Sequence, residues 1–270
     1  MTTPLYLYAA LTLDPQMQLS HILTVYRPSV PSKEFIAKKV REESNELEIL
    51  KFLNAFQPQP EHIILLHDWF QTQSTSWAIL PKMDSVADYV MVSPNELSRN
   101  LVQVCWGLIM GVGFLHRHCI AHRDIKPDNL LVDGDFCLKI IDFDIAMQVK
   151  DENEEVNDEC GTERWMAPEI VEKSMYSPIK ADRWSTGLVL LYLLEGLGKE
   201  EELLVMIARN LTAHDPKQRP SMLEATAPLS DVDDVASERK ASRSRRHIEE
   251  VDGESAKSPR VKKQKLLDNN

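Results

Sequence analysis

The segment HRDIKPDNLL, residues 122–131, places a carboxylate, an amine and an amide close together, at Asp124, Lys126 and Asn129. A second cluster of carboxylates follows in the motif Asp142-Phe143-Asp144. Carboxylate and amide oxygens are ligands that Mg²⁺ accepts, and a lysine neutralises anionic oxygens. Two short loops of this composition therefore suit the transfer of a phosphoryl group, in which positioning and charge neutralisation supply most of the rate.

A third motif, GTERWMAPE at residues 161–169, completes the series. In order and spacing, the three motifs resemble the catalytic loop, the metal-binding motif and the end of the activation segment of eukaryotic protein kinases. The resemblance covers roughly residues 1–228. It implies an α+β, bilobal fold in which a small antiparallel β-sheet lobe with one helix precedes a mainly helical lobe.

The resemblance also implies roles for individual residues. Asp124 would orient the substrate hydroxyl, Lys126 would neutralise the transferring phosphoryl group, and Thr162 would support both. Asn129 and Asp142 would hold Mg²⁺, with Mn²⁺ as an alternative ion. The lysine at 126 followed by proline is similar to serine/threonine rather than tyrosine kinases, so the acceptor would be a Ser or Thr hydroxyl of a protein.

The ATP-binding lysine is expected in the segment IAKK, where an Ala-x-Lys pattern selects Lys39 over Lys38. Its carboxylate partner would be Glu46, which precedes a helical pattern of leucines. The separation of Lys39 and Glu46 is short for the family, so Glu42 and Glu43 remain alternatives.

The segment WAILPKM resembles the last strand of the first lobe and the hinge that binds adenine. Leu80 would line the back of the nucleotide pocket, and the backbone from Pro81 to Met83 would bond to the purine. Further roles implied by the resemblance are structural: an apolar column, an ion pair and an aspartate that holds the catalytic loop. The residues concerned are Leu50, Leu66, His122 and Phe143 for the column, Glu169 and Arg219 for the pair, and Asp182.

Hydrophobic patterns predict the elements that position these residues. Strands are expected at residues 5–13, 21–26, 34–40, 62–70 and 76–82, with a short helix after Glu46. Ser93 and Glu96 form a capping box, which predicts one helix from Ser93 to about His118. A β-hairpin is expected around Gly134, and an apolar helix over residues 181–197. The expected domain limits are 1–83 and 84–229 for the two lobes and 230–270 for a disordered, charged tail.

Three features depart from the kinase pattern. No glycine precedes Gly107, and the expected glycine-rich loop, residues 13–20, reads LDPQMQLS, which predicts weakened ATP binding. Asp144 replaces a glycine, and we expect its side chain to face solvent, with metal ligation as the alternative. Residues 151–159 carry six carboxylates and no phosphorylatable residue. One of these acids could pair with Arg123 in place of a phosphate; the alternative, which we favour, is a solvated loop.

Composition limits the remaining possibilities. The formal net charge is −11, and the tail from residue 230 carries ten basic and nine acidic residues, so the rest of the chain is acidic. Nucleic-acid binding by the folded domain is therefore not expected. The four cysteines form no Cys-x-x-Cys pair, and no apolar stretch has the length of a membrane span. These features predict an intracellular protein, cytoplasmic or, given the basic clusters of the tail, nuclear.

Two functions fit this sequence. The first is an ATP-dependent serine/threonine protein kinase of compact, divergent form, which would bind ATP and a protein substrate. The second is a pseudokinase scaffold with weak or no nucleotide binding. The catalytic-loop residues favour the first, and the missing glycines favour the second.

Overall fold

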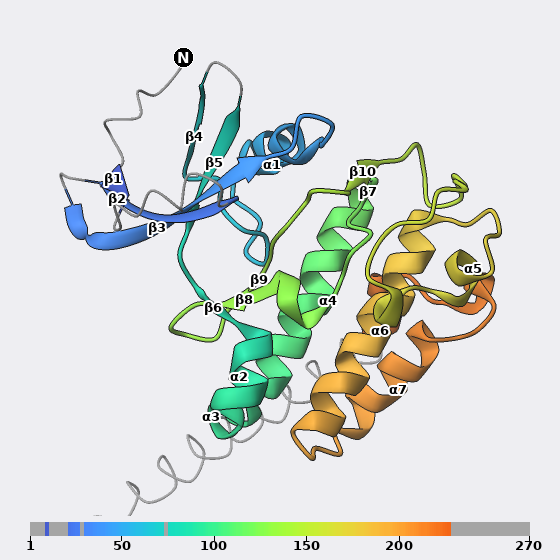
Figure 1. The fold of residues 1–270 in the computed structure, drawn as a ribbon. Coiled ribbons are helices and arrows are strands. Elements are labelled where there is room, and N and C mark those ends of the chain that lie inside the picture. The colour runs from blue at the N-terminus through green and yellow to red at the C-terminus, as the bar shows by residue number, and fades with distance from the viewer. Residues whose placement is uncertain (1–8, 11–20, 28–29, 73–74, 228–270) are drawn as a thin grey trace, which may run out of the picture. The chain divides into compact units, whose positions relative to one another are not determined.

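The computed structural model describes residues 9–10, 21–27, 30–72 and 75–227 of the chain (Figure 1). The chain divides after Ala225 into two units, and the second, Thr226–Asn270, lies almost wholly outside the described residues. The same holds for the glycine-free segment at residues 13–20 and for the basic clusters of the tail. The domain limits expected at 83 and 229 remain predictions.

An antiparallel sheet of five strands forms the first part of the structure. In space the strands follow the order β1-β2-β3-β5-β4, so β3 lies at the centre. Strands β2 and β5 begin and end within one residue of the predicted positions, and β3 begins four residues earlier. Of the first predicted strand, only Ala9–Ala10 lies in the described residues. Strand β4 is shorter than expected, because Ile63 forms only an isolated bridge with Ile140. The strands are β1 (Ala9–Ala10), β2 (Ile22–Arg27), β3 (Val30–Val40), β4 (Asp68–Gln71) and β5 (Ser76–Pro81).

A single helix, α1 (Glu46–Asn54), follows β3. Its leucine pattern produces one buried face, which Leu47, Leu50 and Leu53 share with Ile49. The backbone N–H of Glu46 donates to the Ser44 hydroxyl at 3.0 Å, which satisfies one of the unpaired amides at the helix start. The helix expected after Glu46 is confirmed.

The predicted capping box at Ser93 is wrong. The Ser93 side chain makes no capping bond, although a helix does begin at Pro94. The expected single helix is divided into α3 (Pro94–Arg99) and α4 (Leu101–Arg117), and a further helix, α2 (Val86–Val92), precedes them. Asn100 separates α3 and α4, and its side chain donates to the carbonyl of Glu96 at 3.1 Å. In this part of the chain it is Ser85 that caps a helix, since its side chain accepts from two amides at the start of α2.

Two small sheets are formed mainly by strands that follow α4 in the chain. Strands β8 (Leu130–Val132) and β9 (Leu138–Ile140) form the expected hairpin, and β6 (Asp84–Ser85) pairs with β8. Strand β7 (Ile120–Ala121) pairs with β10 (Met147–Gln148). Residues 122–131, which include the short 3₁₀ helix η3 (Pro127–Asn129), thus follow β7 and end within β8. Both of these strands are paired with other strands, which anchors the two ends of the segment.

The later helices are α5 (Pro168–Val171), α6 (Pro178–Gly196) and α7 (Glu202–Leu211), with 3₁₀ turns at Glu163–Trp165 and Pro216–Gln218. A further helix begins at residue 222. Helix α6 packs against α4 and α7. Gly187 permits this approach, because a Cβ there would lie 2.7 Å from Thr212 Cγ2.

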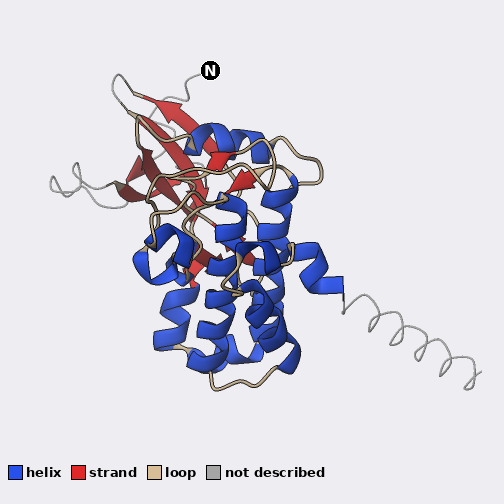
Figure 2. Cartoon of the chain, turned by 90° about the vertical axis from the view of Figure 1, so that its right-hand side faces the viewer, coloured by secondary structure: helices blue, strands red, loops and turns tan. Residues whose placement is uncertain are grey.

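The strands gather toward one end of this unit and the helices toward the other (Figure 2). The predicted α+β arrangement, with a sheet followed by a mainly helical part, is confirmed. None of the helices in the described ranges combines the length and the hydrophobicity that a membrane span requires.

Candidate active site

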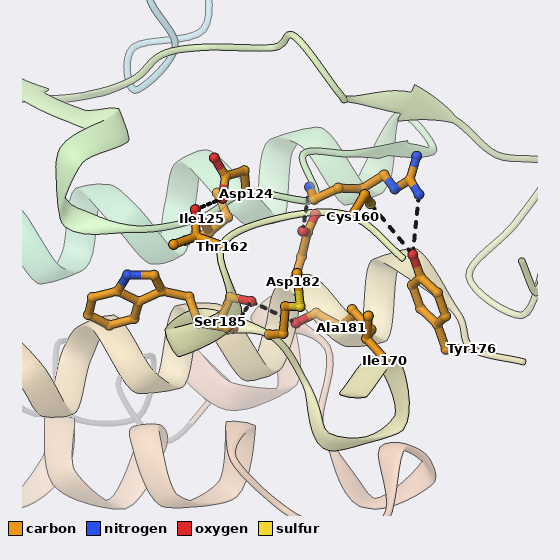
Figure 3. A pocket seen from close by; sticks show the side chains of 12 residues that line it. Asp124, Ile125, Cys160, Thr162, Ile170, Tyr176, Ala181, Asp182 and Ser185 are labelled. Carbon is orange, nitrogen blue, oxygen red and sulfur yellow. Dashed lines mark hydrogen bonds between the residues drawn. The ribbon is translucent and has the colours of Figure 1, made fainter. Parts of the chain in front are cut away.

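Asp124 is held by three side chains. The Thr162 hydroxyl donates to its Oδ1 at 2.8 Å, and Lys126 Nζ lies 2.7 Å from its Oδ2. Lys126 also donates to Thr162 at 2.8 Å, and Asn129 Nδ2 donates to the backbone carbonyl and Oδ2 of Asp124 at 2.9 and 3.1 Å. Figure 3 shows Thr162 pointing toward Asp124. The structure therefore brings the four residues expected to be catalytic into contact.

Asp182 on α6 holds the backbone of this loop. Its two carboxylate oxygens accept from the amides of His122 and Arg123 at 2.7 and 2.8 Å. Arg123 adopts a left-handed backbone, with φ of 71°. Gly161 lies against it with φ of 105°, and a Cβ at position 161 would come within 2.7 Å of the Arg123 carbonyl oxygen. Only glycine fits this turn without strain, so Gly161 lets Thr162 reach Asp124.

The lysine that enters the site from β3 is Lys38. Its Nζ donates to Glu46 Oε1 and to Asp142 Oδ1, both at 2.6 Å. Lys39, which the sequence pattern selected, is exposed. Glu46, the expected carboxylate partner, thus pairs with Lys38 and not with the expected Lys39. Glu42 and Glu43, the alternative partners, are also exposed.

The pairing register of the sheet explains this difference. Side chains alternate between the two faces of a strand, so Lys38 and Lys39 lie on opposite faces. Lys38 is paired with Ala78, and Ile36 with Leu80. The other face of β3 carries Phe35 and Ala37, which belong to an apolar cluster with Val25, Phe70 and Ile79.

Burial and charge act against each other at this ion pair. Burial opposes the charge on Lys38, but Glu46 and Asp142 outweigh it and raise its pKa. Burial raises the pKa of Glu46 to about 7, although Lys38 acts in the opposite direction. For Asp142, burial opposes ionisation but the charge and hydrogen bond of Lys38 lower its pKa. Lys38 therefore remains an ammonium, and Asp142 a carboxylate, at neutral pH.

Asp144 faces inward, so the expectation that its side chain would face solvent is wrong. The side chain is only 16% exposed, and its Oδ1 lies 3.5 Å from Lys38 Nζ. Its Oδ2 lies 3.1 Å from Nε of Arg41. Asp144 is therefore a third carboxylate beside Glu46 and Asp142, and Arg41 is a second cation beside Lys38.

The expected apolar column is buried throughout. Leu50, Leu66, His122 and Phe143 are each at most 5% exposed. The rings of His122 and Phe143 meet edge to face with centroids 5.0 Å apart. His122 Nε2 also lies 2.8 Å from the Ile141 carbonyl oxygen, which fixes the ring beside the Asp142 motif.

Arg123 pairs with Asp158, one of the six acids of residues 151–159. The phenol of Tyr176 donates to the backbone carbonyl of Asp158 at 3.0 Å and lies 3.2 Å from Arg123 Nη2. Burial opposes ionisation of Asp158, but Arg123 outweighs it and lowers the pKa of that carboxylate. For Asp158, the interpretation as a solvated loop is wrong, and an acid does bind the arginine.

We expect Asp158→Ala to raise the rate of amide exchange in residues 151–160 about fivefold, because loss of a partly exposed ion pair costs up to ~1 kcal/mol. Glu155→Gln, an exposed position in the same loop, is the control.

Because the folded-state pKa of Asp158 is lowered, the contribution of this carboxylate to the stability of the loop is present above the ordinary Asp range near pH 4. It is lost only as the pH falls through the lowered value. The protection of these amides against exchange should therefore be constant between pH 8 and 5. A phosphate group in place of the Asp158 carboxylate would instead lose charge near pH 6. Equal exchange in Asp158→Ala and the parent protein would contradict the assignment.

A cavity of about 400 Å³ joins these groups. Its lining includes Asp124 and Lys126 from one loop, Asp142 and Asp144 from the other, and Arg41 from the loop after β3. Glu46, Asp142 and Asp144 offer carboxylate oxygens within 4.8 Å of one another. The site thus combines a hydrogen-bonded carboxylate, two nearby lysines and an acidic, cation-binding corner.

Residues 27–201 match the family described as protein kinase domain. The chain belongs to the protein kinase family. The match begins in β2 and ends just before α7, so it contains both motif loops and the Lys38–Glu46 pair.

Serine/threonine kinases are among the similar proteins. The Candida albicans serine/threonine-protein kinase CST20 is 32% identical over 178 residues, which cover 60% of this chain and 14% of that protein. The Arabidopsis thaliana CBL-interacting serine/threonine-protein kinase 20 is 32% identical over 155 residues, 56% of this chain and 35% of that protein. The Debaryomyces hansenii serine/threonine-protein kinase STE20 is 30% identical over 167 residues, 62% of this chain and 14% of that protein. The chain therefore matches about a third or less of the length of these relatives.

Proteins of the kinase family use ATP with a divalent cation, and the residues present fit both. Asn129 donates to Asp124 through Nδ2, which leaves its amide oxygen as the group available to a cation. Together with a carboxylate oxygen of Asp142, this gives the oxygen donors that Mg²⁺ prefers. Lys38 supplies a positive charge beside them for phosphate oxygens.

The adenine contacts expected of Leu80 and of the backbone near Met83 remain predictions. Leu80 is buried at the end of β5, and Met83 lies half-buried immediately before β6. The sequence did not indicate Arg41, Ser44 or Tyr176 as site residues. No local motif marks them, since each contacts a partner far away along the chain.

Proposed function

We propose that this protein transfers the γ-phosphoryl group of ATP to Ser or Thr hydroxyls of protein substrates. The observation that carries the proposal is the triangle of Asp124, Lys126 and Thr162, whose sides are 2.7 to 2.8 Å. Asp142 lines the same cavity. An orienting carboxylate, a cation and a metal-binding carboxylate around one cavity are the parts that phosphoryl transfer requires.

Asp124 is proposed to accept a hydrogen bond from the substrate hydroxyl and to take up its proton as the hydroxyl oxygen bonds to the γ-phosphorus. The bond from that phosphorus to the bridging oxygen of the β-phosphate breaks, and ADP leaves. Lys126 lies beside it and would balance negative charge on the transferring group. Thr162 fixes the relative positions of the two side chains, because it donates to one and accepts from the other. Orientation of this kind contributes strongly to the rate, because groups that are already positioned lose little further translational and rotational freedom in the transition state.

Lys38 is proposed to contact the phosphates of ATP, and Glu46 to hold the Lys38 side chain in position for this contact. Asp142 and Asn129 would hold Mg²⁺, or Mn²⁺, which neutralises charge on the β- and γ-phosphates when bound. Leu80 and the backbone near Met83 would contact the adenine. Lys39 has no part in this arrangement.

Incubation with γ-labelled ATP, Mg²⁺ or Mn²⁺ and a generic basic or acidic protein tests the proposal. Acid hydrolysis of the product should release labelled phosphoserine or phosphothreonine. Absence of label from both the substrate and the chain itself, at several ATP concentrations, would contradict the proposal. The interpretation as a scaffold without catalysis would then stand.

Lys38→Met is expected to lower kcat/KM for ATP by about 10²–10³, the effect of removing one preorganised charge partner. Lys39→Met is the matched control, because the same side chain is removed one residue away at an exposed position. We expect its kcat/KM to stay close to that of the parent protein. If Lys39→Met is the damaging substitution, the assignment of Lys38 is wrong.

A further inference from the structure

The loop between β3 and α1 is attached to the Asp142-Phe143-Asp144 motif by contacts on two sides of Asp144. Arg41 Nε lies 3.1 Å from Oδ2 of the Asp144 side chain. The Ser44 hydroxyl donates to the backbone carbonyl of Asp144 at 2.8 Å and accepts from the amide of Glu46 at 3.0 Å. The motif is thus connected directly to the start of the helix that carries Glu46.

We propose that Arg41 and Asp144 form a latch that positions the metal-binding motif and helix α1 for phosphoryl transfer. The proposal rests on the proposed function, which it extends to Arg41, outside the kinase motifs, and to Asp144, which stands at the glycine position of the metal-binding motif. Both are positioning residues, because they act through Lys38, Glu46 and Asp142.

The charges around Lys38 explain why Asp144 requires Arg41. Glu46 and Asp142 each lie 2.6 Å from Lys38 Nζ, and Asp144 adds a third carboxylate at 3.5 Å. Without compensation, this excess of negative charge would repel the phosphates of ATP. Arg41 binds the outer oxygen of Asp144 and balances the added charge. Its own side chain is 72% exposed, so it loses little hydration.

The backbone at Asp144 does not require the glycine of the family pattern. Asp142 is left-handed, with φ of 66°, but Asp144 is not among the described non-glycine residues with positive φ. A residue with a side chain at a compatible position has fewer alternative conformations than glycine. Asp144 therefore restricts the motif, and the bond to Arg41 selects the conformation in which Asp142 reaches Lys38.

A metal ion among the three carboxylates is the competing interpretation. Their oxygens lie within 4.8 Å of one another, which a cation could bridge. However, the ammonium of Lys38 is already 2.6 Å from two of them. The carboxylates thus have an internal cation, and the geometry favours the latch.

A double-mutant cycle tests the latch, with Arg41→Ala, Asp144→Gly and the double variant. Arg41→Ala should raise KM for ATP about fivefold to tenfold, because it leaves Asp144 uncompensated beside Lys38. The double variant should recover to within about twofold of Asp144→Gly. Equal effects of Arg41→Ala with and without Asp144 would overturn the proposal, since Arg41 would then act on the nucleotide directly.

Two further variants separate charge from structure. Arg41→Lys keeps the charge and should stay close to the parent protein in KM for ATP. Glu43→Gln, an exposed position in the same loop, is the matched control and should change neither KM nor kcat. If Arg41→Lys is as defective as Arg41→Ala while Glu43→Gln is normal, charge compensation is not the cause and the proposal is wrong.

Amide exchange of residues 41–46 without nucleotide provides a readout that needs no catalysis. The latch predicts faster exchange in Arg41→Ala and in Asp144→Gly, and no further increase in the double variant. This non-additivity would support the latch even if no variant transferred phosphate, an outcome that would reject only the proposed function. Additive exchange would reject the latch whether or not the protein is active.

Discussion

Replacing Asp124 by Asn is expected to lower kcat for phosphoryl transfer by about 10²–10⁴, the usual contribution of a positioned general base. The amide has nearly the same shape, and its oxygen can still accept from Thr162. It cannot take up a proton, and it carries no charge beside Lys126. KM for ATP should change little, because the proposed nucleotide contacts belong to Lys38 and Asp142. Single-turnover rates at saturating ATP measure the loss.

The control for this prediction is Asp128→Asn. It is the same substitution four residues away in the same loop, at an exposed position. It should leave kcat unchanged, and thermal unfolding should show both variants to be folded. A rate for Asp124→Asn within tenfold of the parent protein would contradict the proposed role of Asp124.

The arrangement of Asp124, Lys126 and Asn129 could be predicted from sequence because the three residues lie close together along the chain. Asp124, Lys126 and Asn129 are fixed relative to one another by a few bonds of backbone and by η3. The contact of Asp124 and Lys126 with Thr162 depends on the turn at Gly161, and Gly161 begins a motif that can be recognised in the sequence. Short-range geometry of this kind is encoded in the order of residues.

The choice between Lys38 and Lys39 could not be made in the same way. A shift of one residue along a strand moves a side chain to the opposite face, and the register depends on neighbouring strands. Here the neighbours are β2 and β5, and β5 lies some forty residues later in the chain. The Ala-x-Lys pattern begins at Ala37 and therefore selected Lys39, which lies on the same face of β3 as Ala37. The structure places Ala37 in the apolar cluster, on the face opposite Lys38.

The charged contacts show a second limit. The sequence contained six candidate acids for Arg123, and only the fold shows that Asp158 is the one in contact. Arg41 and Asp144 are more than a hundred residues apart, so neither suggests the other. Long-range pairs of surface-type residues leave no periodic pattern, unlike the leucines of α1 or the alternation of β2 and β3.

Glu169→Gln is expected to reduce the free energy of unfolding by about 3–5 kcal/mol, the cost of removing one partner of a buried ion pair. Arg219 is fully buried, and its two terminal nitrogens donate to the two oxygens of Glu169 at 2.6 and 2.8 Å. Its remaining N–H groups donate to the carbonyl oxygens of Ala213, Lys180 and His214. In the variant, one guanidinium nitrogen would face an amide NH₂ group and the buried charge would have no counterion. Chemical denaturation measures the loss.

The Lys82–Glu34 pair provides the control, because its N–O distance is also 2.6 Å. Both of its side chains are more than 40% exposed, so water replaces the lost partner and screens the remaining charge. Glu34→Gln should therefore cost at most about 1 kcal/mol. Equal losses for Glu169→Gln and Glu34→Gln would contradict the claim that burial, rather than distance, sets the effect.

A double variant separates the effect of the two charges from that of the hydrogen bonds that Arg219 donates to backbone carbonyls. If Glu169→Leu is combined with Arg219→Met, both charges are removed and the volume is largely kept. Replacement of a buried pair by apolar residues is often neutral in stability. However, the carbonyls of Ala213, Lys180 and His214 would lose their donors, and each unsatisfied group costs about 1–3 kcal/mol. We therefore expect the double variant to remain destabilised. A double variant as stable as the parent protein would show that the carbonyl bonds of Arg219 contribute little to the attachment of the segment around Glu169.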